Sequence, residues 1–130
     1  MKRNFTSILA LILVCPVFGF LTGCGGGSST PPPPPTLAIT ATSGSGQTAT
    51  VGNAFTNMLV ATVTSNGTAA GGVTVTFTPV PGSAGQSCTP SATTVVTGSD
   101  GTASITCTAN LTPGGYSVTA TATGATASFT

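Results

Sequence analysis

From Leu37 to Phe129, apolar and polar residues alternate with a period of two, and turn residues interrupt this alternation at short intervals. A period of two places successive side chains on opposite faces of a β-strand, so each stretch predicts a strand with one buried face. Val95–Val96 marks a further short strand. The apolar positions predicted to face the core are Leu37, Ile39 and Ala41; Leu59, Ala61 and Val63; Val73, Val75 and Phe77; Ala103, Ile105 and Cys107; Tyr116, Val118, Ala120 and Ala122.

Dipeptides that favour tight turns separate the alternating stretches. Glycine reaches positive φ values and proline fixes φ, so both residues help the chain to reverse between strands. The predicted turns are Asn66-Gly67, Gly71-Gly72, Pro81-Gly82, Asp100-Gly101 and Pro113-Gly114. We expect the Asp-Gly pair to form a hairpin. Many short strands spaced in this way predict an all-β sandwich of two sheets, with no helix from Leu37 onward.

A different pattern opens the chain. Ile8–Leu21 is a nearly continuous apolar run that follows Lys2 and Arg3. This length and the preceding positive charge are typical of a secretory signal peptide rather than of a membrane-spanning helix. The run ends in Leu21-Thr22-Gly23-Cys24, which resembles the lipobox of bacterial lipoproteins. That resemblance implies cleavage before Cys24 and attachment of lipid to its thiol, which anchors the protein to a membrane through several acyl chains.

These features divide the chain into a signal peptide (1–23), a lipidated cysteine with its linker (24–36), and a β-sandwich domain (37–130). Within the linker, residues 25–30 are rich in Gly and Ser and predict flexibility, whereas Pro31–Pro35 predicts a stiff polyproline segment of roughly 15 Å. Two alternatives are a signal peptide cut at an ordinary site and an uncleaved membrane anchor. Gly25 stands where the sorting signal of inner-membrane lipoproteins has Asp, so we expect an exported protein anchored at the outer membrane, on its periplasmic or surface face.

Charged side chains are almost absent. The whole chain has 2 basic residues, 1 acidic residue and no His, and both basic residues precede the predicted cleavage site. Nucleic-acid binding requires cations, and general acid–base catalysis and metal binding require clustered His, Cys or carboxylates. Asp100 is expected to shape a turn rather than to act chemically. We therefore predict no enzyme, no catalytic residue, no metal, no cofactor and no nucleic-acid partner.

Two cysteines of the predicted domain are candidates for a disulfide. Cys107 shares the inward face of its strand, and Cys88 lies in the segment before Val95–Val96. Exported compartments are oxidising, and a bond closing a loop of this size stabilises the fold by about 3 kcal/mol on the chain-entropy model. The alternative is a pair of free buried thiols. Cys15 lies in the predicted signal peptide and is expected to be removed with it.

The domain also resembles one bacterial immunoglobulin-like module of the invasin/intimin type (Big-1). The motifs that carry this resemblance are Val51-Gly52, Phe55, Leu59-Val60, Gly-Val-Thr-Val-Thr-Phe at 72–77, Asp-Gly-Thr-Ala at 100–103, Ala109-Asn110, and Pro-Gly-Gly-Tyr-Ser-Val-Thr-Ala at 113–120. The resemblance implies an immunoglobulin-like Greek-key β-sandwich. It also implies the setting of such modules, which act in surface proteins as rods, spacers or adhesive tips.

The expected function is therefore that of a non-catalytic cell-envelope lipoprotein, which displays a single immunoglobulin-like module as an adhesive or structural spacer. The alternative is an assembly or docking component of a larger envelope complex. The expected partner is the membrane, through lipid on Cys24, together with a protein or glycan surface ligand that the sequence does not identify. Thr74, Thr76 and Thr78 form an outward ladder that resembles ice- or glycan-binding faces, but we interpret it as the ordinary exposed side of a strand. We interpret the sequon-like Asn66 and Asn110 as turn residues.

Overall fold

The computed structural model describes residues 31–130, so Cys24 and the rest of the predicted signal and lipidation motif lie outside the described residues. Strands account for all the regular secondary structure of this range, as the alternating pattern predicted. The strands are β1 (Leu37–Ser43), β2 (Leu59–Ser65), β3 (Thr68–Ala69), β4 (Thr74–Val80), β5 (Cys88–Pro90), β6 (Thr94–Val96), β7 (Thr102–Ile105), β8 (Cys107–Ala109), β9 (Ser117–Ala122) and β10 (Ala125–Phe129).

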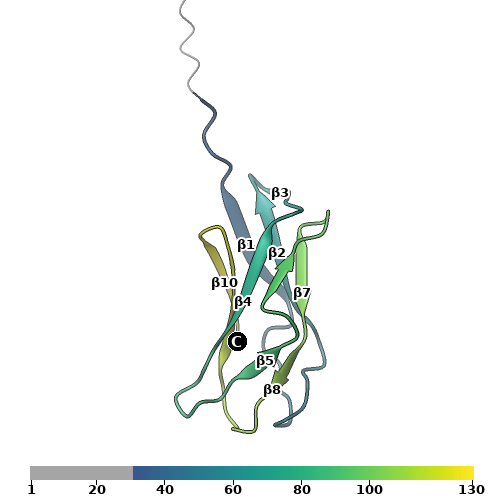
Figure 1. Ribbon diagram of the computed structural model, residues 1–130, viewed down its shortest axis with the longest axis vertical. Coiled ribbons are helices and arrows are strands. Elements are labelled where there is room, and N and C mark those ends of the chain that lie inside the picture. Colours follow the sequence, from purple (N-terminus) through teal and green to yellow (C-terminus); the bar gives the residue numbers. More distant parts are fainter. Residues whose placement is uncertain (1–30) are drawn as a thin grey trace, which may run out of the picture. The chain divides into compact units, whose positions relative to one another are not determined.

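The strands form two four-stranded sheets and one two-stranded sheet, and every pairing is antiparallel (Figure 1). In the first sheet, β2 pairs with β1 along one edge and with both β3 and β7 along the other. The second sheet has the order β10-β9-β4-β6. The chain crosses between the two large sheets after β3, after β6 and after β7, which is the Greek-key arrangement of an immunoglobulin-like sandwich. The predicted fold class is confirmed.

The core lies between the two large sheets and comes entirely from strands of residues 33–130, which form one compact unit. The rings of Phe77 and Phe129 pack with their centroids 6.3 Å apart. Most of the predicted inward positions are buried, which confirms the period-two interpretation. The buried set includes Ile39, Leu59, Ala61, Val63, Val75, Phe77, Ala103, Ile105, Cys107, Val118, Ala120 and Ala122.

The short strand predicted at Val95–Val96 is present as β6, at the edge of its sheet, where Val96 is 59% exposed. One detail of the predicted pattern is wrong. The Asp100-Gly101 turn does not make a hairpin within one sheet. It joins β6 of the second sheet to β7 of the first, so the chain changes layers at this turn.

The two ends of the sandwich are built differently. One end, here named the turn end, carries the short connections at Asn66-Gly67, Gly71-Gly72, 98–101 and Thr123-Gly124. The other, here named the loop end, carries the longer segments 44–58, 81–87 and 110–116, and the small β5–β8 sheet lies beside it (Figure 1). At the turn end, Asn66 and Thr123 adopt positive φ values of 50° and 39°, which permit their tight reversals.

A buried threonine ties the turn end together. Thr97 is 5% exposed, and its hydroxyl donates to the Ala70 carbonyl at 2.6 Å while accepting from the Val73 amide at 2.9 Å. Next to it, the Val63 amide donates to the Gly101 carbonyl at 2.8 Å. The polar groups of these connections therefore find partners within the turns themselves.

Candidate functional site

The loop end contains a cleft of about 410 Å³ that opens between the two large sheets and the β5–β8 pair. Its wall is mainly apolar and includes Phe55, Leu59, Ala109, Tyr116, Val118 and Phe129. Backbone of Gly114 and Gly115 completes one side. A Cβ at Gly114 would collide with the Gln86 side chain, whereas a Cβ at Gly115 would meet nothing within 4 Å.

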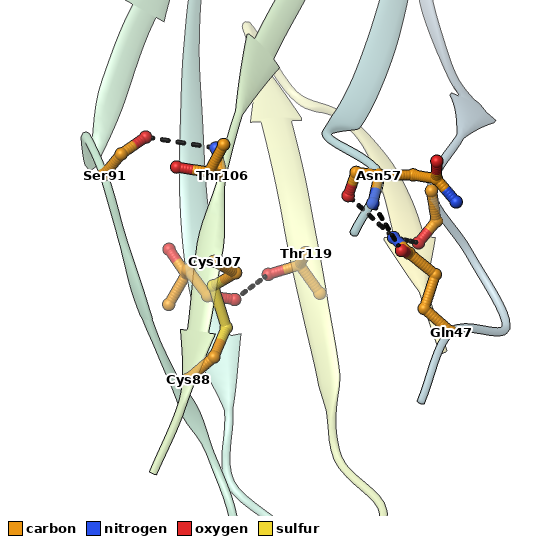
Figure 2. The surroundings of a disulfide bond; sticks show 9 residues. Gln47, Asn57, Cys88, Ser91, Thr106, Cys107 and Thr119 are labelled. Carbon is orange, nitrogen blue, oxygen red and sulfur yellow. Dashed lines mark hydrogen bonds between the residues drawn. A yellow bond between two sulfur atoms is a disulfide. The ribbon is translucent and has the colours of Figure 1, made fainter. Parts of the chain in front are cut away.

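The segment 44–58 forms another side of the cleft and is held by the amide group of one side chain. The Gln47 Nε2 donates to the carbonyls of Gly44 and Asn57, and its Oε1 accepts from the Asn57 amide, each at 2.8 Å (Figure 2). Farther along, the Phe55 amide donates to the Cys107 carbonyl at 2.9 Å. The Gln47 bonds link the two ends of segment 44–58, and the Phe55 bond fastens this segment against β8.

Cys88 and Cys107 form the predicted disulfide, with their Cα atoms 5.7 Å apart (Figure 2). Cys88 lies in β5 and Cys107 in β8, so the bond joins the two strands of the small sheet. Both residues are buried and both line the cleft. The alternative of two free thiols is therefore wrong, and the bond fixes the floor of the candidate site.

Tyr116 is the one residue of the cleft wall with an unoccupied buried polar atom. Its ring packs edge-on against Phe55, with centroids 6.1 Å apart and planes at 64°. Its hydroxyl is buried and finds no hydrogen-bond partner among residues 31–130. Burial raises the pKa of this hydroxyl above its usual value, so the group stays a neutral donor at physiological pH.

The cleft carries no formal charge. Asp100 is the only acidic or basic side chain in residues 31–130, and it lies at the turn end. The Thr102 amide and hydroxyl donate to its carboxylate and lower its pKa, with the hydroxyl 2.8 Å from Oδ2. As predicted, this residue shapes a turn. Across the described range, no cluster of three or more His, Cys, Asp or Glu side chains is present.

The other positions singled out by the sequence take structural roles. The Asn66 side-chain oxygen accepts from the Thr36 amide at 3.2 Å, and the Asn110 Nδ2 donates to the Gly85 carbonyl at 2.7 Å. Thr74, Thr76 and Thr78 are exposed on the outer face of β4. The part of the chain that the structure describes contains no helix that is long and apolar enough to cross a membrane.

Comparison with known proteins gives similarity to solved structures, among them two of intimin domains. No family model matches the chain, and no curated protein matches it. The D00-D0 domain of intimin is 29% identical, with a TM-score of 0.48, over 71% of this chain and 45% of that one. The D0-D1 domain of intimin is 27% identical, also with a TM-score of 0.48, over 71% of this chain and 47% of that one. This chain is similar to intimin domains, and it spans less than half the length of either structure.

Sequence reasoning found the disulfide but missed the cleft. It placed Tyr116 on an inward face, and both Tyr116 and Phe55 are partly buried against the core and also line the cleft. Two local signals pointed to an opening. Gly114 and Gly115 directly precede Tyr116, and the segment between β1 and β2 is too long for a tight turn.

Proposed function

We propose that this chain is a lipid-anchored, non-catalytic module of the bacterial cell envelope, which presents one immunoglobulin-like sandwich as an adhesive or structural element. Lipid on Cys24 provides the membrane attachment, at the outer membrane. The linker that follows holds the sandwich away from the lipid headgroups. The lipobox-like motif and the signal-like run before it support the anchor.

The proposal of a non-catalytic role is supported by the separation of the few titratable groups. Within the described residues, Asp100 lies at the turn end and Tyr116 lines the cleft at the loop end. The cysteines of this range are joined in the disulfide. General acid–base catalysis needs groups that reach one substrate atom together. Two isolated groups at opposite ends of a sandwich do not meet that requirement, so the module acts through its surface.

A docking role in a larger envelope complex is the second candidate. The loop end exposes apolar side chains, with Leu111 80%, Met58 46% and Val51 40% exposed. Exposed apolar groups near one another favour contact with another protein. Protease added to intact cells separates the two roles. Digestion of the sandwich supports surface display, whereas protection until lysis, with envelope proteins co-purifying, supports docking.

Metabolic labelling with palmitate tests the anchor. Wild-type chain should incorporate label, and Cys24→Ser should lose it and accumulate as an unprocessed form. Cys15→Ser is the matched control, because it removes a thiol from the predicted signal peptide and should leave labelling unchanged. Label retained by Cys24→Ser would contradict the assignment.

Trypsin gives an independent test of the cleavage position. The chain from Cys24 onward contains no Lys or Arg, so the processed protein should yield no tryptic fragments even when reduced and unfolded. Fragments ending at a basic residue would show that the N-terminal region is retained.

A further inference from the structure

We infer that the free edge of β10 pairs antiparallel with β10 of a second copy of this chain, so that one sheet of each sandwich continues into the other. The inference names a partner for the adhesive module proposed above, and it rests on that proposed function only where it concerns membranes. It follows from the backbone groups of β10, from the protection of the other edges and from the lack of charge.

β10 leaves backbone hydrogen-bonding groups unpaired. It pairs with β9 alone, and it forms the left side of the sandwich in Figure 1. Thr123-Gly124 is a two-residue hairpin loop, so Ala125 and the alternate residues after it exchange backbone bonds with β9. The amide and carbonyl groups of Thr126 and Ser128 therefore point the other way, towards the free edge.

The residue after β10 supports this orientation. Thr130 lies two positions beyond Ser128, so its backbone groups point to the same side. Its carbonyl accepts from the Gly46 amide, and its amide donates to the Ser45 hydroxyl at 3.0 Å. Among residues 31–130, Thr126 and Ser128 have no bond of this kind, and both residues are exposed. Their backbone groups are available to another strand.

The other edge strands carry features that hinder such pairing. Native edges are protected by short length, bulges, prolines or charges. β1 has a register shift between Ala41 and Ser43 and follows Pro31–Pro35. β3 and β6 have 2 and 3 residues, and β7 begins beside the Asp100 carboxylate. β10 has 5 residues in unbroken register, without proline or charge, so it is the unprotected edge.

The free edge of β10 is complementary to itself. If a two-fold axis passes beside Ala127, Thr126 of each copy lies opposite Ser128 of the other, and each of these pairs exchanges two backbone bonds. The hydroxyl side chains of such a pair lie side by side on the outer face, where they also form cross-strand hydrogen bonds. A shift of register by two residues would bring fewer of the free groups together.

The lack of charge favours a second copy as the occupant. Net charge keeps proteins apart, but Asp100 is the only charged side chain of residues 31–130. It lies at the turn end, and antiparallel pairing places the turn ends of the two copies far from each other. The two edges therefore meet without electrostatic repulsion.

Antiparallel pairing also orients the two membrane anchors. The chain enters β1 at the turn end, where the Asn66 side-chain oxygen accepts from the Thr36 amide. Because the two-fold axis reverses one copy, the two linkers leave the dimer on opposite sides. With lipid on Cys24, as proposed above, such a dimer joins two facing membranes rather than two sites on one membrane.

Sedimentation equilibrium tests the pairing. Residues 33–130, which form a compact unit with its own core, should show a monomer–dimer equilibrium at concentrations up to about 1 mM. Thr126→Lys combined with Ser128→Lys should weaken association at least about ten-fold, because like charges then face each other. Thr74→Lys combined with Thr76→Lys adds the same charge on the exposed face of β4 and should dimerise like wild type. A monomer throughout, which would leave the edge to a strand of another protein, or equal weakening in both variants, would overturn the inference.

Cysteine cross-linking tests the register. Ala127→Cys places two thiols at the two-fold axis, in a pair whose Cα atoms lie about 4.5 Å apart, within the range of a disulfide. Mild oxidation should convert this variant into a covalent dimer. Ala38→Cys makes the same change on the other long edge strand, β1, and should stay monomeric. Failure of Ala127→Cys to cross-link, or equal cross-linking of both variants, would contradict the proposed pairing.

Tethered vesicles test the opposed orientation. A cysteine added before Pro33 couples the domain to phosphatidylcholine vesicles that contain a maleimide lipid, whether or not Cys24 is lipidated in the cell. Many weak contacts act together on each vesicle, so light scattering should show aggregation that excess untethered domain reverses. Vesicles carrying the Thr126→Lys and Ser128→Lys variant should stay dispersed. Dimers in solution without aggregation of vesicles would overturn the opposed orientation, whereas loss of the Cys24 assignment in the palmitate test would leave the edge pairing intact.

Discussion

Two buried hydroxyls distinguish the ends of this sandwich. At the turn end, Thr97 both donates and accepts, and it joins the segments on either side of Gly71-Gly72 to β6. At the loop end, the Tyr116 hydroxyl is buried without a partner beside a cleft. The same two large sheets reach both ends, so the connections and the small β5–β8 sheet create the difference. One end uses its buried hydroxyl for stability, and the other leaves its buried hydroxyl unpaired.

Glycine replacements should give the largest effect. Gly101 at the turn end and Gly85 at the loop end have similar φ values of 75° and 85°. A Cβ at Gly101 would lie 2.5 Å from the Val63 carbonyl oxygen, whereas a Cβ at Gly85 meets nothing within 4 Å. Gly101→Ala should therefore lower the unfolding free energy by about 4 kcal/mol, and Gly85→Ala by about 1 kcal/mol. Urea denaturation measures both, and equal losses would show that packing at the turn end is no tighter.

Loss of the disulfide should have the next largest effect. The bond spans a sequence separation of 19 residues, and its removal by the double change Cys88→Ala and Cys107→Ala should cost about 3 kcal/mol. Denaturation with and without dithiothreitol measures the effect. Reductant should destabilise wild type and leave the double variant unchanged. Equal stability of wild type and double variant would mean that the loop end does not depend on this bond.

Removal of the two hydroxyls should change the stability of the domain in opposite directions. Thr97→Val leaves the Ala70 carbonyl and Val73 amide without their side-chain partner, and should cost about 2 kcal/mol. Tyr116→Phe removes an unpaired buried hydroxyl, and should stabilise the domain by up to about 1 kcal/mol. Thermal unfolding compares the two variants. Destabilisation by Tyr116→Phe would show that the hydroxyl has a partner in solution.

The smallest predicted effects are on the pH dependence of stability, and each end contributes one titratable residue. The pKa of Asp100 is lowered in the folded state from 3.8, so its stabilisation is present above that value and is lost as pH falls through the folded pKa. The pKa of Tyr116 is raised from 10.0, so stability is unaffected below that value and declines as pH rises towards the folded pKa. Asp100→Asn should remove the acid dependence only, and Tyr116→Phe the alkaline dependence only. Dependence that survives these changes would point to other groups.

The alternating pattern predicted the core because burial in a sandwich depends mainly on which face of a strand a residue occupies. Val75 and Phe77 in β4, and Val118 and Ala120 in β9, follow that rule without exception. The pattern did not predict how strands pair. The Asp100-Gly101 turn has the composition of a hairpin, but its strands belong to different sheets because β6 pairs with β4 and β7 pairs with β2. Pairing depends on distant strands, which a local pattern does not contain.

The candidate site was less predictable than the core for a related reason. Cys88 and Cys107 were recognised as a pair because few cysteines were available and the compartment was expected to be oxidising. The cleft instead depends on segments far apart in the sequence, since Phe55 and Tyr116 meet across it. Periodicity assigned Tyr116 correctly to an inward face, but no local signal showed that the space opposite its hydroxyl lacks a partner.

The near absence of charge has a kinetic consequence. With Asp100 as the only charged side chain in residues 31–130, the sandwich produces almost no electric field to attract or orient a partner. Association should then proceed at the unsteered rate of about 10⁵–10⁶ M⁻¹s⁻¹ and change little with ionic strength. Differences in affinity among partners of this surface would arise mainly from how long each complex persists. The module therefore meets its partners at a rate set by diffusion alone, at low and at high salt concentration.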